Sequence, residues 1–294
     1  MNARLQRVWF WVRWLGAAAI GWHFGWGWGL VAAWVYPLSL LPSFAVLRWI
    51  NRGAHAPRWG ELLQAWAREV VATEMSFGWR QPWRTRAEPD HLPEPAQGAT
   101  HGVLLVHGFS CNRAFWNVWM ARLRQQPGVA FVAPSLEPAF GSIDAYAEPL
   151  EQAVQQLVAA TGRMPVIVCH SMGGVAVRAW WRRYGGDGRE APQVITLGTP
   201  HGGTLLAALS PAYNARQMRW QCDWIRALPP LPRLTAVWTP CDQMVMPALT
   251  AAPAGSSAHR IDAVGHVGLV SDPRVWALFQ TALAGSSLST PRRI

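Results

Sequence analysis

The chain has 294 residues, which is enough for one large domain with an appendage or for two modest domains. Its formal net charge at pH 7 is +10, and all 26 basic residues are arginine. These arginines are scattered and form no basic stripe with interleaved aromatic residues, so nucleic acid is not an expected partner. The four cysteines form no C-x-x-C pair and no Cys/His cluster with zinc spacing, so neither a metal nor a cofactor is expected.

An apolar helical hairpin is predicted for residues 1–52. The 34 residues in the range 14–47 include no Asp, Glu, Lys or Arg. As a single helix with a rise of ~1.5 Å per residue, this run would be about 51 Å long. The hydrocarbon core of a bilayer is only about 30 Å thick. Two helices that turn around Gly25, Gly27 and Gly29 therefore fit better.

Membrane lipids are the partner expected for this hairpin. Tryptophan favours the membrane–water boundary, and the segment holds Trp9, Trp11, Trp14, Trp22, Trp26, Trp28, Trp34 and Trp49. Arginines on both flanks predict, by the positive-inside rule, that both ends face the cytoplasm. The expected location is therefore a bacterial inner membrane, with the catalytic domain on the cytoplasmic side. Three alternatives stay open: a signal peptide cleaved near residues 17–19, a hairpin that lies shallowly in the interface, and a soluble hairpin packed on the catalytic domain.

The rest of the chain divides into three predicted parts. Residues 53–99 combine an amphipathic helix over 59–78 with a proline-rich linker. Residues 100–285 form the catalytic domain, and residues 286–294 a flexible tail. Within the catalytic domain, short apolar strands alternate with helices, which predicts a mostly parallel sheet covered by helices on both faces. The strands are expected at residues 103–106, 129–133, 166–169, 194–197 and 234–238.

The sharpest local signal is Cys169-His170-Ser171-Met172-Gly173, between a predicted strand and a predicted helix. A strand that runs through a sharp turn into a helix is the setting of a G-x-S-x-G elbow, whose serine hydroxyl projects above the sheet edge. Gly173 supplies the small residue that is needed after the serine, whereas Cys169 replaces the first glycine. Ser171 is therefore predicted to be a nucleophile. An ordinary serine N-cap is the simpler alternative.

The loop after the first strand supplies a second signal, His107-Gly108-Phe109. A glycine here lets the next backbone amide point into the site. The amides of Phe109 and Met172 are therefore the predicted oxyanion hole. His107 is an alternative base, but it precedes the serine, and elbow enzymes of this type follow the order Ser…Asp…His. It is expected to brace the loop instead.

The acid and the base are predicted late in the chain. Asp242 follows the strand at 234–238, at the edge of a parallel sheet where catalytic groups gather. Asp223, in a predicted helix, and Asp262, too close to the base in sequence to reach it from a separate strand, are the alternatives. His266 is the predicted base, because it lies in a loop whose nearby glycines would let the imidazole swing toward the serine. His259 is expected at the surface, in the polar stretch before the last strand.

Five segments together resemble the α/β-hydrolase superfamily: VLLVHGF (103–109), CHSMGG (169–174), LGTPHGGT (197–204), PCDQMV (240–245) and GHVGL (265–269). The LGTPHGGT segment is similar to the strand-end segment of bacterial triacylglycerol lipases and related esterases. The resemblance covers about residues 100–285 and implies an α/β-hydrolase fold. It also implies a structural rather than catalytic role for His201. Residues 203–233 hold enough apolar side chains for a small helical lid.

The expected activity is hydrolysis of carboxylic esters, in particular lipid-like acyl esters, by a Ser-His-Asp acyl-enzyme mechanism. An acyltransferase or amidase with the same triad is the alternative within enzymes. A membrane scaffold with an inactive hydrolase domain is the alternative outside them. Acyl length and oligomeric state are left open.

Overall fold

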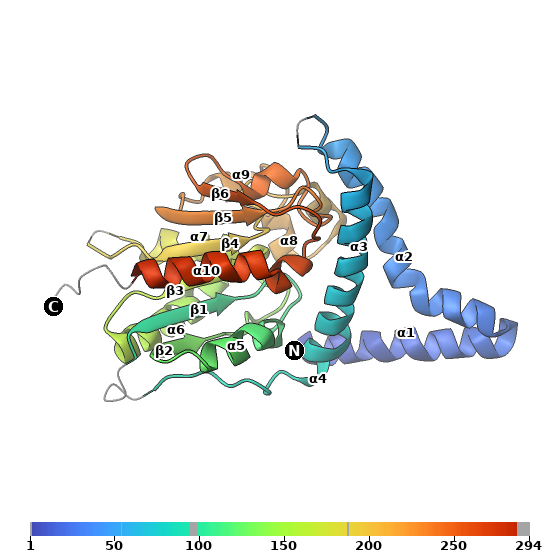
Figure 1. Ribbon diagram of the computed structural model, residues 1–294, viewed down its shortest axis with the longest axis horizontal. Coiled ribbons are helices and arrows are strands. Elements are labelled where there is room, and N and C mark those ends of the chain that lie inside the picture. Colours follow the sequence, from blue (N-terminus) through green and yellow to red (C-terminus); the bar gives the residue numbers. More distant parts are fainter. Residues whose placement is uncertain (1, 54, 94–98, 187, 287–294) are drawn as a thin grey trace.

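The centre of the protein is a six-stranded sheet, seen here in a computed structural model that describes residues 2–53, 55–93, 99–186 and 188–286 (Figure 1). The strand order is β2-β1-β3-β4-β5-β6, and every pair of neighbours is parallel. The strands are β1 His101–Val106, β2 Val129–Val132, β3 Val166–His170, β4 Gln193–Leu197, β5 Arg233–Trp238 and β6 Ser257–Arg260. The predicted α/β-hydrolase sheet is thus confirmed.

Helices cover both faces of this sheet. One face carries α6 (Ala147–Thr161) and α7 (Met172–Tyr184), and the other carries α5 (Asn117–Arg124) and α10 (Pro273–Ser286). The strands supply both cores, since successive side chains alternate between the two faces. In β1, Leu104 packs on the side of α6 and α7, whereas Leu105 packs on the side of α5 and α10. Burial on both sides explains the continuous apolar runs of the strands.

The edge strand β6 was missed by the sequence analysis. It pairs with β5 from Thr235↔Ser257 to Trp238↔Arg260, and three of its four residues are exposed. A polar strand at an edge lacks the apolar run that marks a buried strand. His259 therefore lies within the last strand rather than before it, and it is partly exposed.

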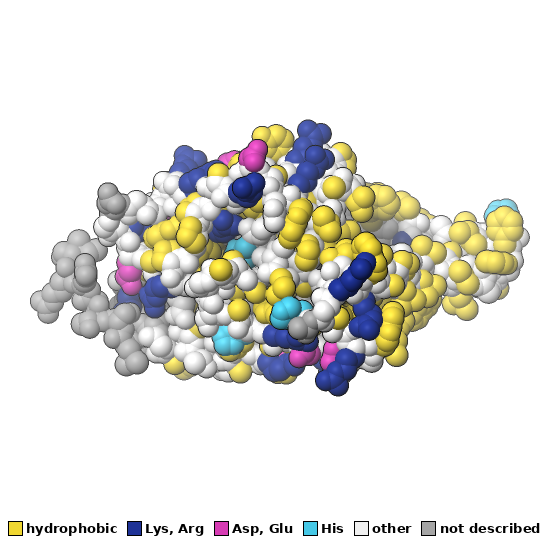
Figure 2. Space-filling view, turned by 90° about the horizontal axis from the view of Figure 1, so that it is seen from above, with side chains coloured by type: hydrophobic (Ala, Val, Ile, Leu, Met, Phe, Trp, Pro, Cys, Tyr) yellow, Lys and Arg dark blue, Asp and Glu magenta, His cyan; other side chains and the backbone are white. Residues whose placement is uncertain are grey.

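Two long helices form the N-terminal segment: α1 (Asn2–Phe24) and α2 (Trp26–Ile50). They meet at Gly25, whose φ of 98° is open to glycine. Close packing follows the turn, because a Cβ at Gly29 would lie 2.9 Å from the carbonyl oxygen of Ala17. The two helices form an arm that projects beyond the sheet and is largely apolar at its surface (Figures 1 and 2).

No single helix among the described residues has the length and apolar composition to cross a bilayer. The two halves of α2, Trp26–Val35 and Pro37–Ile50, are bent by 45° relative to each other, and only together do they meet that test of length and composition.

Helix α3 (Trp59–Thr73) lies between the arm and the sheet (Figure 1). It continues through a π-helical turn, Glu74–Arg80, into α4 (Gln81–Trp83). The amphipathic helix expected over 59–78 is present, and helical structure continues for five residues beyond it, to Trp83. Part of that linker, 94–98, lies outside the described residues. The predicted tail lies outside them too, except for Ser286, which ends α10.

Short helical turns occupy the region that was expected to be a lid, and they are held to the body. They are η5 (Leu205–Leu209), α8 (Tyr213–Gln217) and α9 (Asp223–Arg226). The buried guanidinium of Arg178 donates to the carbonyl oxygens of His201 and Leu228, each at 2.6 Å. Ile225 and Leu228 are buried in the core beneath α7. This segment is therefore packed against α7 rather than standing free.

Candidate active site

Ser171 occupies the turn between β3 and α7 in a strained conformation, with φ 55° and ψ −127°. Such a conformation is rare for a residue with a Cβ and marks a position held by its surroundings. Gly173 explains how the turn packs, because a Cβ there would lie 2.5 Å from the carbonyl oxygen of Val106. Cys169 is completely buried, so a thiol fits where the motif has glycine. The local geometry is that of a nucleophile elbow.

The loop after β1 lies directly against this elbow. A Cβ on Gly108 would come within 2.8 Å of the Cβ of Ser171, so only glycine allows this approach. Within the described part of the chain, the amide of Phe109 has no hydrogen-bond partner. The amide of Met172 opens α7, where the first amides of a helix have no partner within the helix. Two free donors thus flank the serine, as the predicted oxyanion hole requires.

Asp242 and His266 form a buried pair. The Nδ1 atom of His266 lies 2.8 Å from Oδ2 of Asp242, and the two side chains are 6% and 1% exposed. The other carboxylate oxygen, Oδ1, accepts hydrogen bonds from the amides of Met244 at 2.9 Å and Val245 at 2.8 Å, which fixes its orientation. Burial disfavours a charged imidazole, but the charge and hydrogen bond of Asp242, together with the charge of the buried Glu69, outweigh burial, and the pKa of His266 is raised.

Three contacts bring this pair to the elbow. The amide of Ser171 donates to the carbonyl oxygen of Leu197 at 2.9 Å. The next residue, Gly198, is so close to the pair that a Cβ there would lie 2.8 Å from Oδ2 of Asp242. On the other side, the Nε2 of His170 donates to the carbonyl oxygen of His266 at 3.1 Å, and the two rings lie 4.5 Å apart. Ser171, Asp242 and His266 follow β3, β5 and β6, and these contacts bring the three predicted triad residues together at the carboxyl end of the sheet.

The alternative base, His107, is fully engaged elsewhere. Its Nδ1 lies 2.9 Å from the carbonyl oxygen of Gly108, and its Nε2 accepts a hydrogen bond from the amide of Leu136 at 2.9 Å. Burial lowers its pKa to about 4. It braces the loop, as expected.

His201 is also buried and neutral. Its Nε2 lies 3.1 Å from the hydroxyl of Thr196, and burial lowers its pKa to about 3. The alternative acid Asp262 pairs with Arg260 at the surface, at 2.7 Å, and Asp223 begins helix α9. None of these three replaces a member of the Asp242–His266 pair.

Two polar residues around the pair were not singled out in the sequence. Glu69, on α3, is completely buried, and its carboxylate accepts hydrogen bonds from the amides of Val267 and Gly268, each at 2.9 Å. Gln243 lies between Glu69 and His266 and bonds to both. One signal could have revealed Glu69: it lies seven residues after the buried Leu62, on the apolar face of the amphipathic helix.

The glycines beside His266 serve a different purpose from the one predicted. A Cβ at Gly265 would lie 2.6 Å from Oε2 of Glu69, so this glycine admits the carboxylate. Gly268 is also close to Glu69, at 3.4 Å by the same measure. Close packing, rather than freedom for the imidazole to swing, accounts for both positions.

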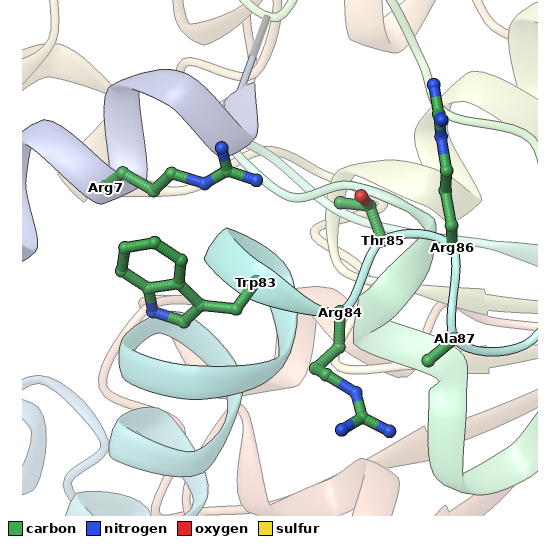
Figure 3. Close-up of a pocket in the computed structure, with 6 residues that line it drawn as sticks. All are labelled: Arg7, Trp83, Arg84, Thr85, Arg86 and Ala87. Atoms are coloured by element: carbon green, nitrogen blue, oxygen red, sulfur yellow. The ribbon is translucent and has the colours of Figure 1, made fainter.

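A hollow of about 480 Å³ lies between α1 and the segment after α4, away from this site (Figure 3). Arg7, Arg84 and Arg86 line it, but the side chains of Arg84 and Arg86 point in opposite directions (Figure 3). Arg7 already donates to the carbonyl oxygen of Pro82 at 2.6 Å. The arginines do not converge on a common point. Across the described ranges, no group of three or more His, Cys, Asp or Glu side chains is arranged to hold a metal ion.

Comparison with known proteins agrees with the fold. Residues 103–286 match the model of the alpha/beta hydrolase family, and the chain belongs to that family. It is similar to lipase B of Aspergillus fumigatus, with 17% identity, a TM-score of 0.55, and coverage of 68% of this chain and 57% of that one. It is also similar to the mature Bacillus licheniformis lipase BlEst2, with 17% identity, a TM-score of 0.52, and coverage of 66% and 95%. Among curated proteins, none matches the chain.

Proposed function

We propose that the chain is a serine hydrolase that cleaves carboxylic esters through an acyl-enzyme. Ser171 attacks the carbonyl carbon while Nε2 of His266 takes its proton, and Asp242 holds the imidazole in the required tautomer and stabilises its cation. The amides of Phe109 and Met172 donate to the oxyanion. The histidine gives its proton to the leaving alcohol, and then activates the water that releases the acid.

The buried Asp242–His266 hydrogen bond of 2.8 Å beside a strained serine is the observation that carries this proposal. A carboxylate away from water needs a partner, and here the histidine and two amides supply it. A helix cap would require neither the strained serine nor the histidine. The arrangement supports nucleophilic catalysis over the simple N-cap alternative.

Apolar side chains near the elbow favour an acyl ester with a lipid-like chain. The rings of Phe109 and Phe140 lie 5.6 Å apart, and Phe140 is exposed. Met244, two residues after the acid, and Leu205, in the segment after β4, are exposed as well. These two segments are joined, because the Thr204 hydroxyl donates to the carbonyl oxygen of Met244 at 2.9 Å. An acyl chain bound at Ser171 could therefore pack against apolar side chains on either side of the serine and be removed from water.

A series of p-nitrophenyl esters from acetate to palmitate tests the proposal, with Ser171→Ala as the control. We expect turnover that rises toward longer chains and falls by roughly 10⁶-fold in Ser171→Ala. Equal rates across the series would contradict a preference for lipid-like substrates but would still support esterase activity. Turnover that needs an added alcohol or amine would indicate the acyltransferase. No turnover above the control would favour the inactive scaffold.

We also propose that the arm of α1 and α2 binds a membrane surface from the cytoplasmic side of a bacterial inner membrane. All eight tryptophans noted in this segment are exposed, with Trp22 at 79%. Tryptophan prefers the membrane–water interface, and so large an exposed apolar surface is rare in proteins that stay in water. Arginines flank the uncharged run 14–47 on both sides, which favours the cytoplasmic side by the positive-inside rule.

Sedimentation with vesicles of phosphatidylcholine and phosphatidylglycerol tests this binding. The variant Trp22→Ser/Trp26→Ser/Trp28→Ser, at the tip of the arm, should stay in the supernatant. The matched control Trp59→Ser, on α3 and equally exposed at 64%, should sediment like the wild type. Equal sedimentation of both variants would contradict binding through the tip. Extraction of native membranes with carbonate then separates an embedded arm, which stays in the pellet, from a shallow one.

A further inference from the structure

Glu69 is a carboxylate in the protein interior that comes from outside the residues matched by the family, 103–286. Its Oε1 accepts hydrogen bonds from the amide of Val267 at 2.9 Å and from the side-chain amide of Gln243 at 2.5 Å. Its Oε2 accepts one from the amide of Gly268 at 2.9 Å. Gln243 directly follows the acid, Asp242, in the sequence. Val267 and Gly268 are the two residues that follow the base, His266.

Gln243 connects Glu69 to the base more directly. Its side-chain oxygen accepts a hydrogen bond from the backbone amide of His266 at 3.2 Å. The residue before it is Asp242, so one side chain joins α3, the acid loop and the base loop. The backbone of His266 is held from the other side by His170. A shift of the Glu69 carboxylate would therefore move the imidazole relative to the elbow.

We infer that Glu69 is a positioning residue for His266. It holds the base loop through two hydrogen bonds and Gln243 of the acid loop through a third, and it sets a second negative charge beside the imidazole. This inference rests on the proposed role of His266 as the base. Glu69 touches neither Ser171 nor the predicted oxyanion donors, so it acts through the base alone.

Burial raises the pKa of Glu69, while the hydrogen bonds from Val267 and Gly268, the nearby His266 and the hydrogen bond from Gln243 oppose that rise. The ionised carboxylate has an effect of its own on the base. Three groups interact with the imidazole: Asp242 and Glu69, which favour its cation, and His170, whose ring lies 4.5 Å away and is tilted by 53°. Burial disfavours the cation, and the two carboxylates together hold the pKa of His266 above its ordinary value. The pKa of His170 lies well below its usual range, because it is buried and next to His266, so His170 stays neutral.

A simpler explanation is that Glu69 only docks α3 on the body. A neutral side chain that accepts hydrogen bonds could do that, without the cost of burying a carboxylate. The two explanations differ in what they predict for the titration of His266. A docking residue changes stability and total activity, whereas a charge beside the base also changes the pH at which the base becomes active.

The test compares three full-length variants in ester hydrolysis. Glu69→Gln keeps the length and removes the charge. Glu69→Asp keeps the charge and shortens the reach. Glu61→Gln is the matched control on the same helix, where the new side chain can still accept the bond from the amide of Arg58, now 2.9 Å. Rates are divided by the concentration of sites that react with a fluorophosphonate, so that unfolded protein does not count.

For Glu69→Gln we expect kcat to fall by about 10²-fold, the effect of a misplaced catalytic group, with KM within about twofold. The acid limb of its kcat/KM profile should move to lower pH. In Glu69→Asp kcat should fall while the limb stays in place, and Glu61→Gln should match the wild type.

Wild-type kcat in Glu69→Gln, or a reduced kcat with an unmoved acid limb, overturns the inference. If Glu69→Gln does not fold, Glu69→Asp provides the test. A wild-type kcat in Glu69→Asp would show that the length of the Glu69 side chain is not needed to position the base, and would overturn the inference. Absence of Ser171-dependent turnover in the wild type would instead overturn the proposed function, so the two failures are distinct.

Discussion

Gly198 offers the sharpest test of how tightly the acid–base pair is held. It follows β4 with a φ of 57°, and a Cβ there would lie 2.8 Å from Oδ2 of Asp242 and 3.1 Å from Nδ1 of His266. Gly198→Ala therefore has two costs. An alanine in this left-handed conformation loses about 1–2 kcal/mol of stability. The pair must also move away to restore ordinary contact distances.

The loss of activity follows from the size of that movement. Restoring contact to about 3.4 Å shifts the carboxylate by roughly half an ångström, and a 1 Å misplacement costs about 10²-fold. We therefore expect kcat to fall by about 10- to 100-fold, because the imidazole must follow the carboxylate. KM should change little, since Gly198 faces the pair.

Hydrolysis of p-nitrophenyl butyrate, with the melting temperature measured alongside, provides the assay. Gly202→Ala is the control, because it lies in the same segment and its added Cβ would meet only Thr250, at 3.7 Å and 3.8 Å. It should keep wild-type kcat. If Gly198→Ala turns over like Gly202→Ala and melts at the wild-type temperature, the pair is not held as the structure has it.

Two further predictions concern titration and thiol reactivity. The raised pKa of His266 means that kcat/KM should rise with pH through that pKa, because only the neutral imidazole takes a proton. Asp242→Asn should lower kcat by about 10⁴-fold and move the acid limb to lower pH, and a pH–rate profile with an unmoved limb would contradict the pairing. Burial raises the pKa of the Cys111 and Cys241 thiols to about 12 and that of Cys169 well above its usual range. Iodoacetamide should therefore modify only the partly exposed Cys222 in the folded protein and all four cysteines in urea, as measured by mass spectrometry; early modification of Cys241 would show that its loop opens.

The elements that the sequence predicted well are those whose pattern is local. The helix predicted after Ser171 is present as α7 (Met172–Tyr184), because an elbow starts it and Gly185 follows it. The buried strands show as apolar runs for the same reason. The polar edge strand Ser257–Arg260 has no such pattern, since only its neighbour β5 determines that it is a strand.

The site was predictable as far as its residues follow a motif. Ser171, Asp242 and His266 each follow a strand, and a parallel sheet brings such ends to one edge. Glu69 follows no motif of this kind, because its partners Val267 and Gly268 lie almost 200 residues later in the chain. The reason for Gly265 was misjudged for the same cause: the glycine admits a carboxylate that the local sequence does not reveal.

The division of the chain near residue 100 stays a prediction, and polar contacts cross that boundary to several loops of the site. Gln6 on α1 donates to the carbonyl oxygen of Ser110 at 3.0 Å, beside the predicted oxyanion loop. Asn51, at the end of α2, accepts from the amide of Ala248 at 3.1 Å, in the loop that follows the acid.

Glu69 makes the third such contact across the boundary, to the loop that carries His266. A chain that starts at residue 100 would lose the carboxylate that accepts from the amides of Val267 and Gly268, and with it the contact that fixes the base loop. A chain that starts at Arg58 would lose the arm but keep α3 and Glu69. If the helices before residue 100 are needed for the geometry of the base, the longer of these two chains should retain far more ester hydrolysis. Equal activity in both would mean that the loops hold their positions without help from the N-terminal helices.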